Sequence, residues 1–326
     1  HMPGTVKSEL LPDADRSHKC DCQEKVSWKR NLPLDKSHFI TETNPSKYLG
    51  ASHAAVYGAH PGVLVKLIDS AERLGIQVHP DRETAEKLFH SAFGKTECWH
   101  VLGCRKVGQE NPCVYAGLKK GITKEHWKRL FEKLDIAGML SCLHRFDVHP
   151  GDTILIMGGV PHAIGAGCSL IEIQEPTDYT LRVERVTPSG FPMDDFLCHQ
   201  GIGFDKMFDC FHYEGISWEE AKAQWFIPAR YRYRGTEGTV RQLISQEQIP
   251  YFEMRESYTS SCLNVQNERF CGLYVVEGRG CLSWRGGSQN IEAPCQFFLP
   301  ADVKQISLEA AAVHPLRVLQ FFGPSV

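Results

Sequence analysis

The 326-residue sequence has no long uninterrupted run of apolar residues. No run approaches the roughly 18 residues that a membrane-spanning helix needs, and the first 30 residues lack the apolar centre of a secretory signal. We therefore expect a cytoplasmic protein that does not act at a membrane. The sequence also lacks an excess of positive charge, since its formal net charge is -3. Without such an excess, there is no electrostatic basis for binding nucleic acid.

The cysteines show no framework of disulfide bonds. There are 13 of them, an odd number, and most stand in apolar, strand-like runs. This usage is typical of buried thiols in a reducing compartment. Cys20 and Cys22, with His18 nearby, form a single metal-like pair in a polar leader. One pair does not complete a structural zinc site, so we favour a leader without a metal.

Short apolar runs, separated by glycine and proline, fill the stretch from Val63 to Val186. Their spacing predicts an all-β sandwich or barrel. One helix should interrupt the strands, because Trp127, Leu130 and Phe131, followed by Leu134, form one apolar stripe. A second short helix is expected from Ser217 to Trp225, with a capping box at its start. The runs that we expect to be strands are GVLVKLID, ECWHVLG, PCVYAGL, DTILIMG and CSLIEIQ.

After about Arg234 the pattern is again purely β, with alternating runs joined by the turns EGRG and RGGS. The segment from Phe270 to Phe322 could close a second, smaller barrel. We therefore predict a mainly β protein with two barrels in tandem and a few short helices. The expected divisions are a leader over 1–45, a first domain over 46–234 that includes the helical insert, and a C-terminal barrel over 235–326.

Polar side chains in three of these runs could meet at a metal. Gln77 and His79 stand two apart and should share one face of a strand, while Val78 packs on the other. Glu97 begins a second apolar run, and His162 lies in the rigid loop GGVPHAIGAG. Each has an ordinary explanation alone: a polar strand face, a solvated glutamate, a turn histidine. Together they make an N2O2 set that suits a catalytic metal site with an open position.

Charged residues accompany this set. Lys95 should share a face with Glu97, and Lys66 interrupts an apolar run, so it is either exposed or buried and paired. Asp178 and Arg182 stand four apart and would share a face in an extended strand. Such a pair is usually a salt bridge, but beside a metal an arginine can bind a phosphate or an oxyanion.

The segments QVHPD, GKTECW, PHAIGAG and LIEIQEPTDYTLR are similar, in order and spacing, to the signature segments of type I phosphomannose isomerases. That family belongs to the cupin superfamily. The resemblance is strong from about Gly62 to Val186, and the room between Glu97 and His162 fits the compact bacterial form. It departs after QVHP, where the second of two acidic residues is replaced by Arg82, and after Arg182, where VERVTPSG follows.

The resemblance implies a zinc-dependent interconversion of mannose 6-phosphate and fructose 6-phosphate through a cis-enediolate. It places the zinc ligands at Gln77, His79, Glu97 and His162. The resemblance assigns the catalytic pocket to Lys66, Lys95, Asp178 and Arg182, and it makes 46–234 a catalytic cupin domain. The general base stays open between a lysine, a water at the metal and Asp178. The alternatives are a metal-dependent isomerase of another sugar or sugar phosphate, and a sugar-binding cupin without catalysis.

Overall fold

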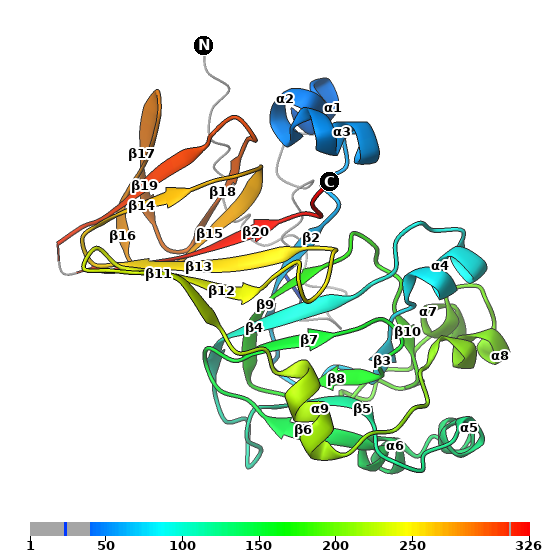
Figure 1. Ribbon diagram of the computed structural model, residues 1–326. Helices are drawn as coiled ribbons and strands as arrows, with labels where there is room; N and C mark the ends of the chain where they lie inside the picture. The colour runs from blue at the N-terminus through cyan, green and yellow to red at the C-terminus, as the bar shows by residue number, and fades with distance from the viewer. Residues whose placement is uncertain (1–22, 25–39, 313) are drawn as a thin grey trace. The chain divides into compact units, whose positions relative to one another are not determined.

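The computed structural model describes residues 23–24, 40–312 and 314–326 (Figure 1). Their contacts form two compact units. Residues 23–24 and 66–227 make up one, called here the site unit, and residues 40–65 and 228–326 make up the C-terminal unit. Each unit is dominated by antiparallel strands, so the predicted mainly β fold with a few short helices is confirmed. The sequence-based divisions at residues 45 and 234 stay a prediction, whereas the contacts divide the chain near residues 65 and 227.

The site unit contains two five-stranded sheets. All five apolar runs that were expected to be strands are strands. The first sheet has the order β1 (Gln23–Glu24), β2 (Leu64–Asp69), β9 (Cys168–Gln174), β4 (Glu97–Cys104), β7 (Thr153–Ile156). The second has the order β10 (Leu181–Arg182), β3 (Gln77–Val78), β8 (His162–Ile164), β5 (Cys113–Leu118), β6 (Leu143–Asp147).

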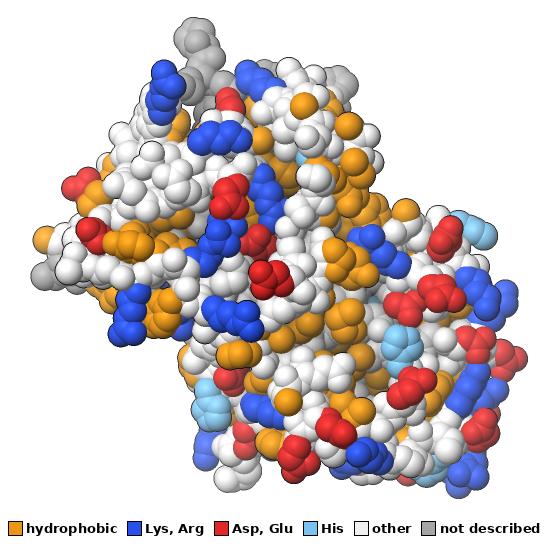
Figure 2. Space-filling model, in the orientation of Figure 1, with side chains coloured by type: hydrophobic (Ala, Val, Ile, Leu, Met, Phe, Trp, Pro, Cys, Tyr) orange, Lys and Arg blue, Asp and Glu red, His pale blue; other side chains and the backbone are white. Residues whose placement is uncertain are grey.

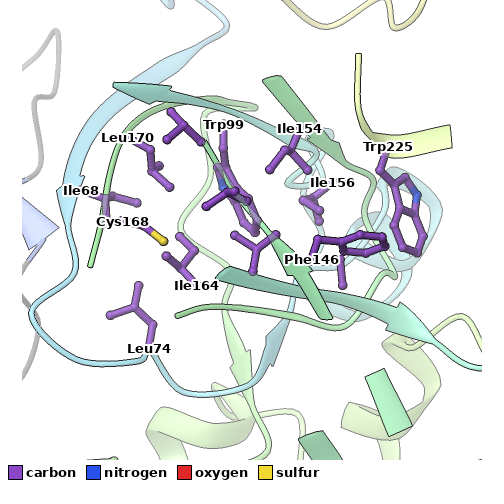
Figure 3. Packing of buried hydrophobic residues seen from close by; sticks show 14 of the residues in the cluster. Ile68, Leu74, Trp99, Phe146, Ile154, Ile156, Ile164, Cys168, Leu170 and Trp225 are labelled. Carbon is purple, nitrogen blue, oxygen red and sulfur yellow. The ribbon is translucent and has the colours of Figure 1, made fainter. Parts of the chain in front are cut away.

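A hydrophobic core joins the two sheets of the site unit (Figure 3). Trp99 and Ile154 of the first sheet and Phe146 and Ile164 of the second are all buried in one cluster. Trp225, on α9 (Trp218–Trp225), packs against the same cluster. Ser217 caps this helix with the predicted capping box. Because the inward residues alternate along each strand, a polar residue at an inward position lies inside the unit.

The other face of the second sheet is covered by helices. Val78 and Leu181 of that sheet are fully buried in a cluster with Trp127 and Phe131. Val78 therefore packs as expected, on the face opposite Gln77. The helices other than α9 in the site unit are α4 (Arg82–Phe89), α5 (Lys124–Glu132), α6 (Ile136–Cys142), α7 (Asp195–His199), α8 (Phe204–Met207) and the 3-10 turn η3 (Phe208–Cys210).

The prediction of one continuous helix with Leu134 in its apolar stripe is wrong. Helix α5 ends at Glu132, and Leu134 adopts a positive φ of 54° and is 52% exposed. Asp135 then caps α6, because its side chain accepts a hydrogen bond from the amide of Gly138. The side chain of Asp135 caps a new helix. The apolar stripe of the first helix therefore ends before Leu134.

The C-terminal unit has a six-stranded and a four-stranded sheet. The turn EGRG carries the chain from one sheet to the other, whereas the turn RGGS closes a hairpin within the four-stranded sheet. The larger sheet has the order β11 (Arg230–Arg234), β12 (Thr239–Ile244), β13 (Glu253–Thr259), β20 (Leu316–Phe322), β15 (Cys271–Glu277), β18 (Cys295–Leu299). The smaller has the order β14 (Cys262–Gln266), β19 (Gln305–Ala310), β16 (Arg279–Trp284), β17 (Gly287–Glu292).

Three short helices precede the strands of this unit in sequence and pack on it. They are α1 (Ile40–Thr43), α2 (Pro45–Leu49) and α3 (Ala51–Tyr57). Leu49 contacts Phe270 and Ala301 in a small buried cluster. Across the described residues, no helix combines the length and apolar character needed to cross a membrane. Basic and acidic side chains are interspersed on the visible face (Figure 2), as expected for a net charge near zero.

A buried carboxylate of the C-terminal unit supplies a test of stability. Glu256 on β13 pairs with Arg241, with Nη2 2.5 Å from Oε1, and with Arg317, whose Nε is 2.6 Å from Oε2. Burial opposes the charge, yet Arg317 and Arg241 hold the pKa of Glu256 below its usual value. We expect Glu256→Gln to lower the free energy of unfolding by about 2 kcal/mol at pH 7, measured by urea denaturation.

The same pair predicts a pH dependence. A carboxyl whose pKa is depressed by folding contributes stability above its unfolded pKa, and this contribution is lost as the pH falls through the folded pKa. The gap between wild type and Glu256→Gln should therefore narrow below about pH 4. Glu247→Gln, at an exposed position, is the matched control. It should change neither the free energy of unfolding at pH 7 nor its dependence on pH. If the difference in free energy of unfolding between wild type and Glu256→Gln stays constant down to pH 3, the stabilising role of the Glu256 carboxylate is contradicted.

Candidate functional site

The residues predicted to bind a metal meet inside the site unit. His79, Glu97 and His162 are all buried, and their candidate ligand atoms lie within 4.8 Å of one another. Nε2 of His79 is 3.2 Å from Oε2 of Glu97, and Nε2 of His162 is 3.2 Å from Oε1. The ligands come from both sheets: Glu97 opens β4, His79 follows β3 directly, and His162 opens β8.

Backbone carbonyls fix the orientation of both imidazoles. Nδ1 of His79 is 2.8 Å from the carbonyl oxygen of Tyr179, and Nδ1 of His162 is 2.9 Å from that of Val160. A carbonyl oxygen can only accept, so each Nδ1 carries a proton and donates it, which directs Nε2 of each ring toward Glu97. Burial, together with Lys95, lowers the pKa of His79 to about 3 and keeps that ring neutral. Metal-binding histidines are typically held in this way.

The donor set fits a divalent cation. Oε1 of Glu97 is buried and makes no hydrogen bond within the described residues, although Nε2 of His162 is 3.2 Å away. A cation between these two atoms would be attracted by the carboxylate and could be bound by both. Imidazole nitrogen and carboxylate oxygen together suit zinc, and they also suit other divalent transition metals.

Gln77 adjoins the donor set as predicted. It pairs directly with His162 across β3 and β8, and its amide nitrogen is 3.2 Å from Nε2 of that ring. A half-turn of the amide exchanges nitrogen and oxygen without changing its shape. In that orientation Gln77 would offer an oxygen to the same centre.

Lys95 lies against the same donors. Lys95 shares a face with Glu97 as expected, and the two form an ion pair with Nζ 2.9 Å from Oε2. Nζ is also 2.6 Å from Nε2 of His79. Lys95 is only 3% exposed. Burial lowers its pKa, although Glu97 opposes that shift. An amine in this position is a candidate proton carrier.

Lys66 is buried and paired, the second of the two alternatives that the sequence left open. Its Nζ is 3.1 Å from Oδ1 of Asp178 and 3.5 Å from Oε1 of Glu172. Burial acts against its charge, but Glu172 and Asp178 leave the pKa of Lys66 above its usual value. Trp99 donates to Oε2 of Glu172 over 3.1 Å. Burial and the nearby Glu97 raise the pKa of Glu172.

Glu172 is absent from the sequence-based set of pocket residues. It stands directly opposite Trp99 on β9, two residues before Gln174, on the inward face of the strand. Period-two alternation within CSLIEIQ is the signal that could have identified it, because a glutamate that continues the inward face of Cys168 and Leu170 must find a partner. Its partner Lys66 is 106 residues away in sequence, so the pairing itself was not visible.

Arg182 lies beside the donor set but not in the way predicted. The expectation that Asp178 and Arg182 share one strand is wrong, because β10 begins only at Leu181. Arg182 is instead directly opposite Gln77 in the pairing of β10 with β3. Arg182, Gln77 and His162 therefore form one row across three strands, on the same face of the sheet. Its Nη1 donates to the carbonyl oxygen of Leu197 over 3.1 Å.

The cysteine pair of the leader, Cys20 and Cys22 with His18, lies outside the described residues. Among the described residues, His79, Glu97 and His162 are the one group of three or more histidine, cysteine or carboxylate side chains close enough to hold a metal.

Comparison with known proteins places the chain. No family model matches it. It is 32% identical over 135 residues to ManA of Bacillus subtilis, which is named mannose-6-phosphate isomerase, in a match that covers 40% of each protein. It is 25% identical to YvyI of the same organism over 271 residues, 80% of this chain and 77% of that protein. The crystal structure of mannose 6-phosphate isomerase from Bacillus subtilis superimposes with a TM-score of 0.64 at 24% identity, over 82% of this chain and 79% of that one.

The chain belongs to the mannose-6-phosphate isomerase family. A zinc-bound mannose 6-phosphate isomerase has the same fold, with a TM-score of 0.65 at 13% identity over 87% of this chain and 84% of that one. In the match with ManA, the chain spans about 40% of that relative's length. The predicted membership of this cupin family is thereby confirmed.

Proposed function

We propose that this chain is a zinc-dependent aldose–ketose isomerase that interconverts mannose 6-phosphate and fructose 6-phosphate. The observation that carries the proposal is the buried group His79, Glu97 and His162 with Lys95 against it. Membership of the mannose-6-phosphate isomerase family supports the choice of substrate. The expected partner is therefore a small sugar phosphate, and no described feature calls for nucleic acid.

Four side chains would hold the metal: His79, Glu97, His162 and, after its half-turn, Gln77. When bound, a divalent ion there would polarise the carbonyl oxygen of the open-chain sugar. Aldose–ketose isomerisation moves a proton between C1 and C2, through a cis-enediolate. The protein must therefore hold two adjacent oxygens, remove a proton from one carbon and return it to the other.

Two buried groups of opposite type are candidates for the proton transfer. Lys95 on the approach to β4 and Glu172 on β9 lie on neighbouring strands. Burial lowers the pKa of Lys95 and raises the pKa of Glu172, so each pKa is shifted in the direction of neutral pH. A general base works best when its pKa is close to the working pH. Asp178, whose side chain is 58% exposed, is the less favoured candidate, because proton transfer between two carbons is better served by a group shielded from water.

Arg182 is the proposed phosphate-binding cation. It lies two strands from His162, at roughly 10 Å between backbones, on the face that carries the donors. An arginine guanidinium binds phosphate oxygens through two parallel hydrogen bonds. Nη1 donates to the carbonyls of Leu197 and Thr180, which leaves the donors on Nε and Nη2 to be used by a ligand.

The direct test pairs metal analysis with an assay. Protein purified without added metal should contain about one zinc per chain and convert mannose 6-phosphate in an assay coupled to fructose 6-phosphate. Removing the metal with a chelator should abolish turnover, and zinc should restore it. Turnover by verified metal-free protein would reject the metal-dependent reaction. If the protein contains metal but does not convert mannose 6-phosphate, the proposed substrate is wrong. Assays with other hexose and pentose phosphates would then either identify the substrate of an isomerase or, if none is converted, indicate a binding protein.

A further inference from the structure

We infer that Gln174 is a positioning residue, which fixes the turn Glu175–Thr177 and so places Asp178 against Lys66. The role of that ion pair in catalysis rests on the proposed function. The contacts of Gln174 are present in the structure and do not depend on the proposed function.

The orientation of the Gln174 amide is determined by its neighbours. Nε2 donates to two carbonyl oxygens, that of Glu175 over 2.9 Å and that of Thr177 over 2.5 Å. Because both neighbours only accept, the group between them must be the NH2, and the opposite atom is the oxygen. The amide therefore closes the turn from inside, as a backbone donor would.

The other end of the same amide is unsatisfied. Oε1 of Gln174 is buried, and none of the residues that the structure describes forms a hydrogen bond with it. An unpaired buried acceptor costs roughly 1–3 kcal/mol, and native structures rarely keep one without a reason. Gln174 therefore uses its NH2 group fully at the turn, while its oxygen adds no hydrogen bond to the stability of the fold.

The location of Gln174 supports the positioning role. It stands directly opposite Glu97 in the pairing of β9 with β4, so both side chains lie on the same face. Two residues earlier on the same face, Glu172 contacts Lys66, and Lys66 in turn contacts Asp178. Gln174 thus closes a ring of contacts that runs from β9 through the turn to Asp178 and back through Lys66.

Asp178 depends on the turn for its position. Its side chain is 58% exposed, so little packing holds it. Further anchors of the turn lie on the segment that leads into β4. The amide of Glu175 donates to the carbonyl of Thr96 over 3.0 Å, and Oγ1 of Thr177 donates to that of Gly94 over 2.6 Å. The turn is therefore fixed to the strand that carries Lys95 and Glu97.

A double-mutant cycle tests the inference. Gln174→Met keeps the side-chain length and removes both the donor and the unpaired acceptor. We expect it to lower kcat/KM about tenfold, mostly through KM, with metal content unchanged. In an Asp178→Ala background the same substitution should cost less than about twofold, because residues that act through one another are not additive. Gln305→Met, at an exposed position on β19, should leave kcat/KM unchanged.

Thr177→Val provides a second variant, since it removes only the hydroxyl bond to Gly94. It should show the same non-additivity with Asp178→Ala. Hydrogen exchange in the peptide covering 175–180 adds a readout that does not require turnover. Exchange there should be faster in Gln174→Met than in wild type or in Gln305→Met, even if the wild-type protein converts no sugar phosphate. Full additivity with Asp178→Ala, or unchanged exchange in this peptide, would overturn the inference.

Discussion

Replacing His162 by alanine should remove the bound metal and lower kcat for mannose 6-phosphate by roughly 100- to 1000-fold. The variant loses Nε2 of His162, the candidate metal ligand atom that lies 3.2 Å from Oε1 of Glu97. Of the buried group, only His79 and Glu97 remain. Zinc then loses one of the ligands that hold it at its usual coordination number. Metal content by elemental analysis and kcat by the coupled assay are the two measurements.

The fold should survive this substitution. His162 is fully buried, and its ring contacts Trp99 edge-on at 5.4 Å between centroids, so alanine leaves a cavity but no new charge. Far-ultraviolet circular dichroism should therefore remain close to that of wild type. His144→Ala is the matched control: this histidine is also buried, on β6 of the same sheet, but it bonds to the carbonyl of Ile216. It should retain metal and activity. Full activity in metal-free His162→Ala would disprove the metal mechanism.

Arg182→Ala should lower kcat/KM for the phosphorylated sugar by about 100-fold. Arg182 is half-buried and bonds mainly to backbone carbonyls, so its removal should change the free energy of unfolding by less than about 1 kcal/mol. Inorganic phosphate gives an independent readout, because its competitive inhibition should weaken in parallel with kcat/KM.

Two variants bracket this result. Arg182→Lys keeps the charge without the two-pronged donor, and should recover only part of the loss. Arg105→Ala removes an exposed arginine that pairs with Asp69 elsewhere in the site unit, and should leave kcat/KM unchanged. An unaltered kcat/KM in Arg182→Ala would exclude Arg182 from the phosphate site.

The donor set was predictable because strand geometry is local. Alternation along a strand places Lys95 with Glu97, and Gln77 opposite Val78, from the sequence alone. Those relationships are all present in the structure. The meeting of His79, Glu97 and His162 was a weaker prediction, because each residue has an ordinary explanation by itself, and the family resemblance strengthened it.

Other features depend on contacts that the sequence does not reveal. The pairing of Glu172 with Lys66 and the row formed by Arg182, Gln77 and His162 arise from strand order, which brings together residues distant along the chain. The break at Leu134 has a different cause. Its apolar side chain continued the helical stripe, but the cap supplied by Asp135 and the positive φ of Leu134 ended the helix earlier.

Glu97 belongs to one sheet of the site unit, whereas Gln77, His79 and His162 lie on or beside strands of the other. An ion held by all four would therefore act as a cross-link between the two sheets, in addition to any part it plays in chemistry. The strand that carries Gln77 has only two residues, so few hydrogen bonds of its own retain it. Removal of the metal should therefore also make this edge of the protein less resistant to heat and to proteolysis.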